Sequence, residues 1–299
     1  MTGLVLALDL GGTRLKAGLV DGATAQVHAA TTAPTKDLDG DAALELLRRM
    51  ATELLDGQRV AGIGVCVPGV VDGGRIVSLP GKFPGIVNRD IGAGLAQAGM
   101  PVTVVNDAIA YGAGEAVYGA GAGHQRVVVM TVGTGVGVCV LEDGQPLGRG
   151  PLGGGILSGQ LPLGVPDQGA RDTSGNSGTV EAVCRAAALV AEATGRGSTA
   201  TDVRTVYDRA ASGEAAAVAA VEHYRWWLSR GIVALSHAHT PSRVVLGGGP
   251  MTAGNPVLPG LQECVDAQLW PGYRVEVALA ALGDHAALVG LAHLAGGAR

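Results

Sequence analysis

The sequence predicts an α/β protein built from two similar domains. Strand patterns alternate with helix patterns along the chain, as is typical of α/β folds. One theme also occurs twice: a strand, a turn of glycine and threonine, and a strand back are found at residues 4–20 and again at 126–141. Such an internal duplication favours two similar domains with a cleft between the two glycine turns. With 299 residues, the chain is long enough for two cores of ordinary size.

Each element is predicted from the spacing of apolar residues and from the residues that end it. Residues 41–55 have helical spacing, and the apolar run 60–67 ends at Pro68-Gly69, as a buried strand does. A long helix from Glu214 is stopped by Thr240-Pro241. Further helices are predicted at 91–98, 108–118, 179–194, 201–211, 256–268 and 285–294, and strands at 102–105, 243–246 and 274–279, while 148–178 is too irregular to assign.

The predicted domains follow this order of elements. We place the first domain at residues 1–118 and the second, larger one at 119–284. We expect the C-terminal helix, at about 285–299, to pack back on the first domain.

Composition and charge exclude several classes of partner. The net charge is −5, and no segment gathers Lys and Arg into a cluster that would bind DNA, RNA or an anionic membrane. Aromatic residues make up 3% of the chain, too few for the stacking surfaces that bind single-stranded nucleic acid. We therefore expect a small-molecule substrate and neither a nucleic acid nor a membrane as partner.

The cysteines and the N-terminus indicate a reducing, cytoplasmic location. The four cysteines are scattered and lie mostly in apolar runs, which favours buried thiols over disulfides or a metal site. The N-terminus lacks a basic region and meets Asp9 too early for a signal peptide, and no apolar stretch is long enough to span a bilayer. The cysteines are Cys66, Cys139, Cys184 and Cys264.

The first glycine turn suits the terminal phosphates of a nucleotide. Gly11 and Gly12 have no side chain, so their N–H groups can approach an anion closely. Thr13 adds a hydroxyl donor, Lys16 adds a positive charge, and Asp9 at the end of the strand could hold a hydrated Mg²⁺. An Asp-x-Gly-Gly hairpin is also an ordinary way to turn a β-ribbon, and these residues alone leave both interpretations open.

Five motifs in order carry a resemblance to a known family. Together they resemble the ROK family of sugar kinases and sugar-responsive repressors, within the actin-like ATPase superfamily. The resemblance spans nearly the whole chain, and it implies two actin-like (ribonuclease H-like) α/β domains and a homodimer. The motifs are Asp9-Leu10-Gly11-Gly12-Thr13 with Lys16, Val67-Pro68-Gly69 with Asp72, Asn106-Asp107 with Gly114-Glu115, Gly133-Thr134-Gly135-Val136-Gly137, and Leu246-Gly247-Gly248-Gly249.

The resemblance implies an ATP-dependent kinase and a role for each motif. The two glycine turns would hold the phosphates, the late glycines would border the adenosine, and Asp9 would act on Mg²⁺ through water. The repressors of the family carry an N-terminal helix-turn-helix, whereas here a strand is predicted within a few residues of Met1, so we do not expect direct DNA binding. The residues so implied are Gly11, Gly12, Thr13 and Lys16, then Thr131, Gly133, Thr134 and Gly135 for the phosphates, and Gly247, Gly248 and Gly249 for the adenosine.

By the same resemblance, Asp107 would be the general base and Gly69 and Asn106 would contact the substrate. A carboxylate at the end of a buried strand can take the proton of a hydroxyl that attacks the γ-phosphate. The amide of Asn106 can both donate and accept, which suits a sugar hydroxyl. The alternative is a helix cap, because Ala108 opens a predicted helix and Asn and Asp are favoured N-cap residues.

The chain departs from the family at its zinc motif. Most members carry Gly-Glu-x-Gly-His and then Cys-x-Cys-Gly-x-x-Gly-Cys-x-Glu, in which the His and three Cys bind a structural zinc. Here Asp172, Ser174 and Thr179 stand in place of the cysteines, and Gln160 stands in place of the histidine. Zinc favours a tetrahedral set of thiolates and imidazoles, so we predict no structural zinc at this site.

The substrate pocket is predicted to differ as well. Leu157 replaces a family glutamate that contacts the sugar, whereas Glu181 is kept and, with Gln160, can still bind hydroxyls. Where the family often has Asn-Leu-x-Gly-Trp, this chain reads Lys82-Phe83-Pro84-Gly85-Ile86, which adds Lys82 and Leu157 as weaker substrate candidates. A lost acceptor implies a ligand with a different polar pattern.

We therefore expect a kinase for a modified sugar or for a cyclitol, a carbocyclic sugar mimic of the valiolone or inositol type. The alternatives are a glucokinase or N-acetylhexosamine kinase, a non-catalytic sugar-sensing protein, and polyphosphate as the donor in place of ATP. Trp226-Trp227 on the long helix is a candidate dimer contact, although one of the two tryptophans could equally pack in the core.

Overall fold

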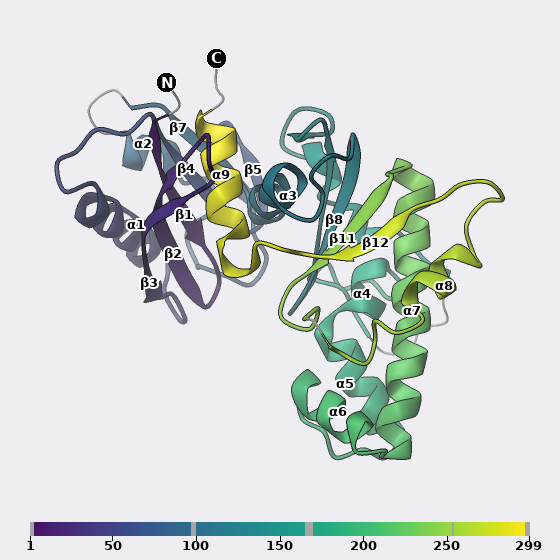
Figure 1. Cartoon of the computed structure of the whole chain (residues 1–299). Helices are drawn as coiled ribbons and strands as arrows, with labels where there is room; N and C mark the ends of the chain where they lie inside the picture. The colour runs from purple at the N-terminus through teal and green to yellow at the C-terminus, as the bar shows by residue number, and fades with distance from the viewer. Residues whose placement is uncertain (1–2, 97–99, 165–169, 253, 297–299) are drawn as a thin grey trace. The chain divides into compact units, whose positions relative to one another are not determined.

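The computed structural model of the chain describes residues 3–96, 100–164, 170–252 and 254–296 (Figure 1). The chain divides into two compact units. The first unit comprises residues 1–123, 144–156 and 281–299, and the second comprises 124–143 and 157–280. The domain boundaries expected from the sequence, 1–118 and 119–284, differ in leaving residues 119–123, 144–156 and 281–284 with the second domain, because such short segments have no periodic signal. The predicted α/β fold class is confirmed.

The first unit is built on a five-stranded sheet in the order β3-β2-β1-β4-β7. Strands β1, β4 and β7 run parallel, whereas β1, β2 and β3 form an antiparallel meander. The hairpin predicted at residues 4–20 is therefore present, and β3 was not predicted. The strands are β1 (Leu4–Leu10), β2 (Arg14–Asp21), β3 (Val27–Pro34), β4 (Gly62–Val67) and β7 (Val102–Asn106), with a separate ribbon of β5 (Val70–Asp72) and β6 (Arg75–Ser78).

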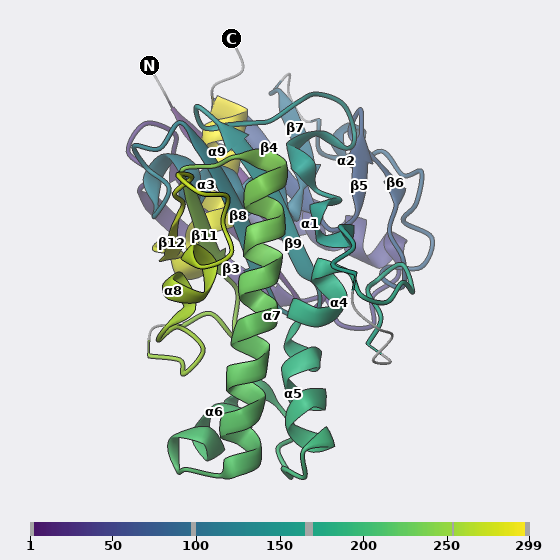
Figure 2. The same ribbon diagram turned by 90° about the vertical axis from the view of Figure 1, so that its right-hand side faces the viewer.

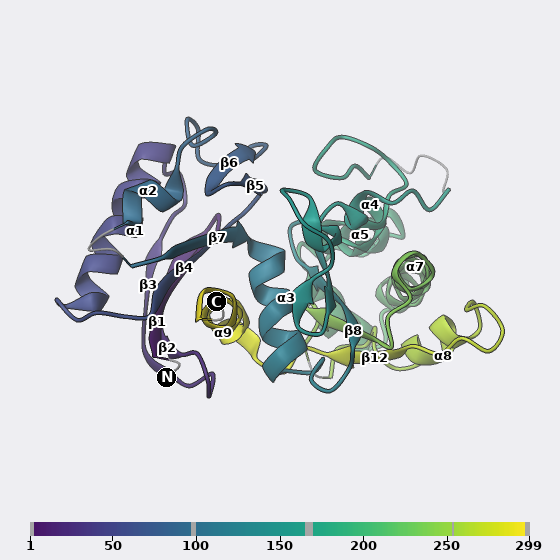
Figure 3. The ribbon, with the colours of Figure 1, turned by 90° about the horizontal axis from the view of Figure 1, so that it is seen from above.

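Side chains alternate along β1, and residues on both faces of this strand are buried. Leu6 and Leu8 point into a core under α1 (Gly40–Leu55) and α2 (Ile91–Leu95). Val5 and Ala7 point to the other face, against α9 (Ala286–Gly296). Figure 3 shows α1 and α2 on one side of the sheet and α9 on the other.

Helix α3 (Asp107–Tyr118) packs closely on α9 through glycine. A Cβ on Gly290 would lie 1.8 Å from the carbonyl oxygen of Ala110, and a Cβ on Gly114 would lie 2.2 Å from that of Ala286. The neighbouring Glu115 is fully buried, and its carboxylate accepts the backbone N–H groups of Ala281 and Leu282, at 3.0 and 2.8 Å. The Gly114-Glu115 motif thus holds the C-terminal segment onto the first unit.

The second unit repeats the hairpin and parallel-strand pattern. Its strands run in the order β9-β8-β11-β12, with β8 and β9 antiparallel and the other pairs parallel. Figure 2 shows α5 and α6 beside the long helix α7. The elements are β8 (Arg126–Val132), β9 (Val136–Glu142), β11 (Arg243–Gly247) and β12 (Glu276–Leu279), with α4 (Val180–Cys184), α5 (Ala186–Gly195), α6 (Val203–Ala211), α7 (Ala215–His239) and α8 (Leu261–Asp266).

Several predicted helices are shorter than expected or broken, two of them for clear local reasons. The helix expected at 179–194 breaks at Arg185, whose backbone is extended, and the next N–H, of Ala186, donates to the carbonyl of Gly133 at 3.0 Å. The helix expected at 256–268 begins only at Leu261, after Gly260 with a φ of +77°. Residues 97–98, 165–169 and 297–299, within segments predicted as helix or as irregular chain, lie outside the described residues. No helix in the described part of the chain is both long and apolar enough to cross a membrane.

Short elements complete the structure. The strand β10 (Gln145–Pro146) and the 3₁₀ turn η1 (Gly153–Gly155) belong to the first unit. A second 3₁₀ turn, η2 (Ser158–Gln160), belongs to the second unit, and a third, η3 (Gly283–His285), leads directly into α9. The described residues of the segment predicted to be irregular therefore contain single turns of helix and isolated β-bridges.

Candidate functional site

The first group of candidate residues lies at one edge of the sheet in the first unit. The strands β1, β4 and β7 are parallel, so their carboxyl ends meet at the same edge. In the pairing register, Asp9 lies opposite Cys66, and Val67 lies opposite Asn106. Asp107 follows directly as the first residue of α3. The fold therefore brings the predicted magnesium carboxylate and the predicted base to one edge.

Asp9 is a partly buried carboxylate with an unusual donor. The thiol of Cys66 donates to its Oδ1 at 3.3 Å. Burial raises the pKa of Asp9 above its usual value, and the Cys66 hydrogen bond and the positive charge of Lys16 oppose that rise. Burial also raises the pKa of the Cys66 thiol well above its usual value, which keeps the proton on the donor. Sequence reasoning had treated Cys66 only as a buried thiol.

The glycine turn leaves two amides for an anion. The N–H of Gly11 donates to the carbonyl of Arg14 at 3.0 Å, so it is used within the turn. Within the described residues, the N–H groups of Gly12 and Thr13 donate to no protein acceptor. Thr35, which sequence reasoning missed, fixes the turn from the end of β3: its hydroxyl donates to Gly11 O at 2.6 Å, and its N–H donates to Thr13 O at 3.0 Å. The turn is thus an ordered hairpin that can also accept an anion.

Lys16, predicted to face the phosphates, has a protein partner. Its ammonium donates to Asp284 at 3.0 Å from Oδ1 and 3.1 Å from the carbonyl oxygen. Arg14 also donates to the Asp284 carboxylate, at 3.2 Å. The hydrogen bond from Lys16 is the main reason that the pKa of Asp284 lies below its usual value. Asp284 lies 268 residues further along the chain, in η3, and no local pattern marked it.

A second lysine lies against the turn. An ideal Cβ placed on Gly12 would be 3.1 Å from Cε of Lys82 and 3.3 Å from its Nζ. The loop that carries Lys82 connects β6 to α2. Lys82 was predicted as a weak substrate contact, and the structure places it beside the first glycine turn.

Asn106 acts as a cap, as the alternative interpretation predicted, and it also ties two loops together. It is the N-cap of α3, with its Oδ1 accepting the N–H of Ala108 at 2.8 Å. Its Nδ2 donates to the carbonyl of Gly69 at 2.7 Å. Gly69 has a φ of +86°, and a Cβ there would lie 2.2 Å from the carbonyl oxygen of Ser78. Asn106 and Gly69 therefore position the start of α3 and the residue that follows, Asp107.

Asp107 carries the chemistry that a general base requires. Burial and the nearby negative charge of Asp9 raise the pKa of Asp107 to about 6, and the positive charge of Lys82 acts in the opposite direction. Its Oδ1 accepts the N–H of Ala108 at 2.9 Å, which holds the carboxylate in place. A base that ionises near pH 6 is charged at neutral pH and still basic enough to take a hydroxyl proton in a transition state.

The second unit holds the other glycine turn and the late glycines side by side. Thr131 pairs with Gly247 in the parallel register of β8 and β11. Gly248 has a φ of +93°, and a Cβ there would lie 2.0 Å from the carbonyl oxygen of Val132. Thr131, Val132 and the turn from Gly133 to Gly135 thus form one edge with the Gly247–Gly249 segment. Thr134 is exposed at the tip of that turn.

Glu181 is buried beside the same turn, and both of its carboxylate oxygens accept hydrogen bonds. Only 3% of the residue is exposed, and a Cβ on Gly135 would lie 2.8 Å from its Oε1. Its Oε1 accepts from the hydroxyl and the N–H of Thr173, and its Oε2 accepts from Nε2 of Gln160 at 2.6 Å. Glu181 and Gln160 were both predicted, whereas Thr173 was missed. Leu157 is 50% exposed at the start of η2.

Hydrogen bonds centred on Asp172 order the loop where the family has its zinc cysteines. Oδ1 of Asp172 accepts the N–H groups of Ser174 and Asn176, at 2.8 and 2.9 Å. Its Oδ2 accepts the hydroxyl of Thr179 at 3.0 Å. Within the part of the chain that the structure describes, no group of three or more His, Cys, Asp or Glu side chains fits a metal ion. Asp172 and Thr179, which stand in place of two of the family's cysteines, are thus joined by a hydrogen bond from the Thr179 hydroxyl to the Asp172 carboxylate.

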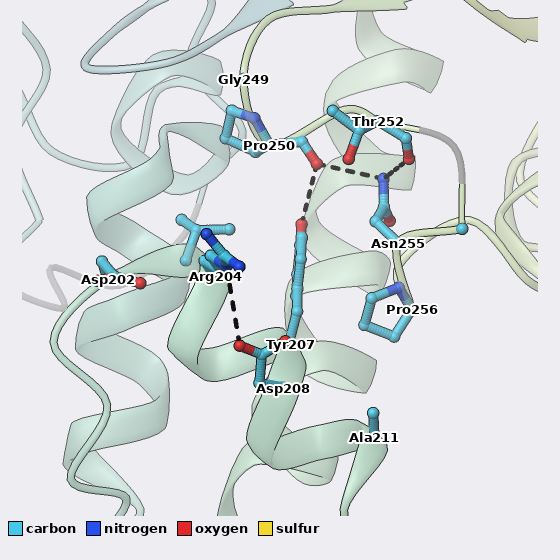
Figure 4. Close-up of a pocket in the computed structure, with 12 residues that line it drawn as sticks. Asp202, Arg204, Tyr207, Asp208, Ala211, Gly249, Pro250, Thr252, Asn255 and Pro256 are labelled. Atoms are coloured by element: carbon cyan, nitrogen blue, oxygen red, sulfur yellow. Dashed lines mark hydrogen bonds and ion pairs between the residues drawn. The ribbon is translucent and has the colours of Figure 1, made fainter.

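A cavity of about 660 Å³ adjoins the late glycines in the second unit (Figure 4). It lies between α6 and the segment that follows β11. Tyr207 donates its hydroxyl to the carbonyl of Pro250 at 3.3 Å, and Asn255 donates to the same carbonyl at 3.2 Å. The walls include Arg204, Tyr207, Gly249, Pro250, Thr252 and Asn255, of which only Gly249 was predicted. The other lining residues come from separate segments of the chain, so no local sequence pattern marks them as parts of one site.

Comparison with known proteins shows which family this chain resembles over its length. A model described as "ROK family" matches residues 5–298. The chain is 30% identical to a glucokinase of Thermotoga maritima, over 97% of this chain and 96% of the relative. It is 32% identical to an N-acetylmannosamine kinase of Citrobacter koseri, over 98% of both chains.

Among solved structures, a ROK family glucokinase from Streptomyces griseus in complex with glucose and AMPPNP matches with a TM-score of 0.80. It is 26% identical, and the match covers 98% of this chain and 99% of the other. The family model and the full-length relatives both point to the family that the sequence motifs resemble. The chain therefore belongs to the ROK family.

Proposed function

We propose that this chain is an ATP-dependent kinase that phosphorylates a hydroxyl of a sugar or sugar-like polyol. The observation that carries the proposal is Asp107, a carboxylate with a pKa of about 6 at the sheet edge that also carries the glycine turn. The sugar-kinase relatives support the class of reaction. A purely sugar-sensing protein has no need of a positioned base, so the geometry favours the enzyme.

The reaction follows from the positions in the first unit. Asp107 accepts the proton of the substrate hydroxyl as its oxygen forms a bond to the γ-phosphorus of ATP. The bond from that phosphorus to the β–γ bridging oxygen breaks, and ADP leaves with the bonding electrons. The free amides of Gly12 and Thr13 donate to the transferring phosphate.

Asp9 is the residue that would hold the metal in this proposal. Its carboxylate lies at the same edge, and a carboxylate acting through water together with phosphate oxygens is a donor set that Mg²⁺ accepts. When bound, Mg²⁺ would neutralise part of the phosphate charge. The Cys66 thiol fixes the orientation of the carboxylate by donating to Oδ1. We propose no zinc, and metal analysis that found stoichiometric zinc in the purified protein would contradict this.

In the second unit, we propose that the cavity beside Gly249 takes the adenosine. Its volume of about 660 Å³ is within the range typical of small-molecule sites. The sequence implied that Gly247, Gly248 and Gly249 border this group, and the cavity lies at the last of these glycines. Calorimetric titration with AMPPNP tests this: Thr252→Trp, which enlarges a side chain that lines the cavity, should weaken binding, whereas Lys36→Trp, at an exposed residue of the first unit, should not.

The proposed substrate is a modified sugar or a cyclitol and not plain glucose. Leu157, half-exposed, offers no acceptor where the family has a glutamate. Both oxygens of the Glu181 carboxylate already accept hydrogen bonds, from Gln160 and Thr173, so fewer lone pairs remain for a ligand hydroxyl. A hydroxyl-rich ligand that needed a free acceptor at this end would lose a hydrogen bond. A modified sugar or carbocyclic mimic with a different polar pattern fits better.

A panel assay tests both parts of the proposal. Hexoses, amino sugars and cyclitols are each supplied with ATP or polyphosphate, and ADP release and the phosphorylated product are measured. Transfer from ATP to a modified sugar or cyclitol is expected. Strong preference for glucose would contradict the proposed substrate but would still support the proposed kinase activity. Binding of a sugar without transfer from either donor would indicate the sensor instead.

We also propose a homodimer that uses the exposed side of Trp226. Trp227 is buried and Trp226 is 43% exposed, so one tryptophan of the pair packs in the core and the other faces solvent. Trp226 stacks on His223 and lies under the guanidinium of Arg230, 5.6 Å from the ring centroid. Light scattering of the wild type and of Trp226→Glu tests this, because a dimer through this face should become a monomer.

A further inference from the structure

Lys82 is fixed in position by its neighbours in the chain. Phe83 has a φ of +46°, in the left-handed region that non-glycine residues avoid, and its side chain is buried in the core of the first unit. The N–H of Ile86 donates to the carbonyl of Phe83 at 3.0 Å, and the N–H of Gly40 donates to that of Pro84 at 2.8 Å. A strained backbone held by buried contacts is often kept for function.

This fixed loop directs the Lys82 side chain over the phosphate turn. The end of the side chain covers Gly12, where a Cβ would come within 3.1 to 3.3 Å of Cδ, Cε and Nζ. A larger residue at Gly12 would displace the lysine. The exposed amides of the turn and the ammonium group are therefore close enough to share one anion.

The charge of Lys82 is available for such an anion. Lys16 is held by Asp284, whereas the Lys82 ammonium makes no hydrogen bond or ion pair within residues 3–96, 100–164, 170–252 and 254–296. Two charged groups act on Asp107: Asp9, from β1, raises its pKa, and Lys82 lowers it. Lys82 thus acts on both the turn and the base.

We propose that Lys82 binds the transferring phosphoryl group in this chain and neutralises its charge during transfer to the hydroxyl deprotonated by Asp107. This inference rests on the proposed kinase function. A fixed cation near the phosphoryl oxygens stabilises the charge that develops in the transition state. The family often has a neutral asparagine where this chain has Lys82, so the cation is a departure of this sequence.

The test compares Lys82→Met, Lys82→Arg and the matched control Lys36→Met. Lys36 is also an exposed lysine, and within the described part of the chain it makes no hydrogen bond or ion pair with the glycine turn or with Asp107. Steady-state kinetics with the acceptor found in the panel should show kcat falling about 10- to 100-fold for Lys82→Met, with a small change in KM for the acceptor. Lys82→Arg should recover most of the rate, and Lys36→Met should match the wild type.

A pH profile separates this role from a structural one. Removing the Lys82 charge removes an effect that lowers the pKa of Asp107, so the acid limb of kcat/KM for Lys82→Met should move to higher pH than in the wild type. An unchanged kcat, a loss confined to KM for the acceptor, or an unmoved acid limb would overturn the role of Lys82. A wild-type chain that transfers phosphate to no acceptor would instead overturn the proposed function itself.

Discussion

Replacing Asp107 by Asn removes the proposed base while keeping the local structure. The amide of Asn has the same shape, and its oxygen can still accept the N–H of Ala108 that now binds Oδ1. The amide cannot take a proton, so turnover should fall by about 10²- to 10⁴-fold, the usual contribution of a general base. Binding of AMPPNP should remain, because no proposed nucleotide contact is lost.

The same substitution should stabilise the fold, for an electrostatic reason. The pKa of Asp107 is raised from 3.8 to about 6, so the folded state disfavours the ionised carboxylate. This cost is fully present above pH 6, decreases as the pH falls from 6 to 3.8, and is absent below 3.8, where both states are protonated. Asp107→Asn should therefore raise the free energy of unfolding at pH 7 by at most about 3 kcal/mol.

Two measurements check this pair of effects. Thermal unfolding at pH 7 should show a higher Tm for Asp107→Asn than for the wild type, and the difference should shrink at pH 4. A coupled ADP assay should show the loss of turnover in the same preparation. Turnover above about one tenth of the wild-type rate, or a lower Tm at pH 7, would refute the assignment of Asp107 as a base whose ionised form the fold disfavours.

Three further predictions follow from the same geometry. The kcat/KM of the wild type should fall about tenfold per pH unit below pH 6 as Asp107 takes up a proton, and a profile flat down to pH 5 would contradict this. Gly248→Ala should lower the free energy of unfolding by more than about 2 kcal/mol, because a Cβ there meets the backbone of β8 at 2.0 Å with a φ of +93°, whereas the open Gly249→Ala should unfold like the wild type. Asp172→Ala should cost about 1–3 kcal/mol in urea unfolding, because it leaves two N–H groups and the Thr179 hydroxyl unpaired, and an unchanged midpoint would show that these hydrogen bonds do not order the loop.

Local patterns in the sequence were sufficient for the fold class and for the glycine turns. A hairpin, a buried parallel strand and an amphipathic helix each leave a period in the chain, so the alternation of elements could be read directly. Gly69 and Gly248 are required by positive φ values and by close backbone contacts, which is why these motifs were visible as glycines. Asp107 was visible because it directly follows the apolar strand β7.

The tertiary structure alone decided which charged side chains contact one another and how the pKa of Asp107 is shifted. Asp284 binds Lys16, and the Lys82 side chain covers Gly12, across separations in the sequence that no periodic pattern spans. The pKa of Asp107 depends on burial and on the charges of Asp9 and Lys82, which the fold brings together from three segments.

The same division holds in the second unit. The replacement of the zinc ligands was plain in the sequence, but the hydrogen bonds from Thr179 to Asp172 and from Gln160 to Glu181 required coordinates. Sequence by itself determined which chemical groups the chain carries and which secondary structures hold them, because both depend on near neighbours. The fold determined which groups meet, because contact between distant segments depends on how the sheets and helices pack.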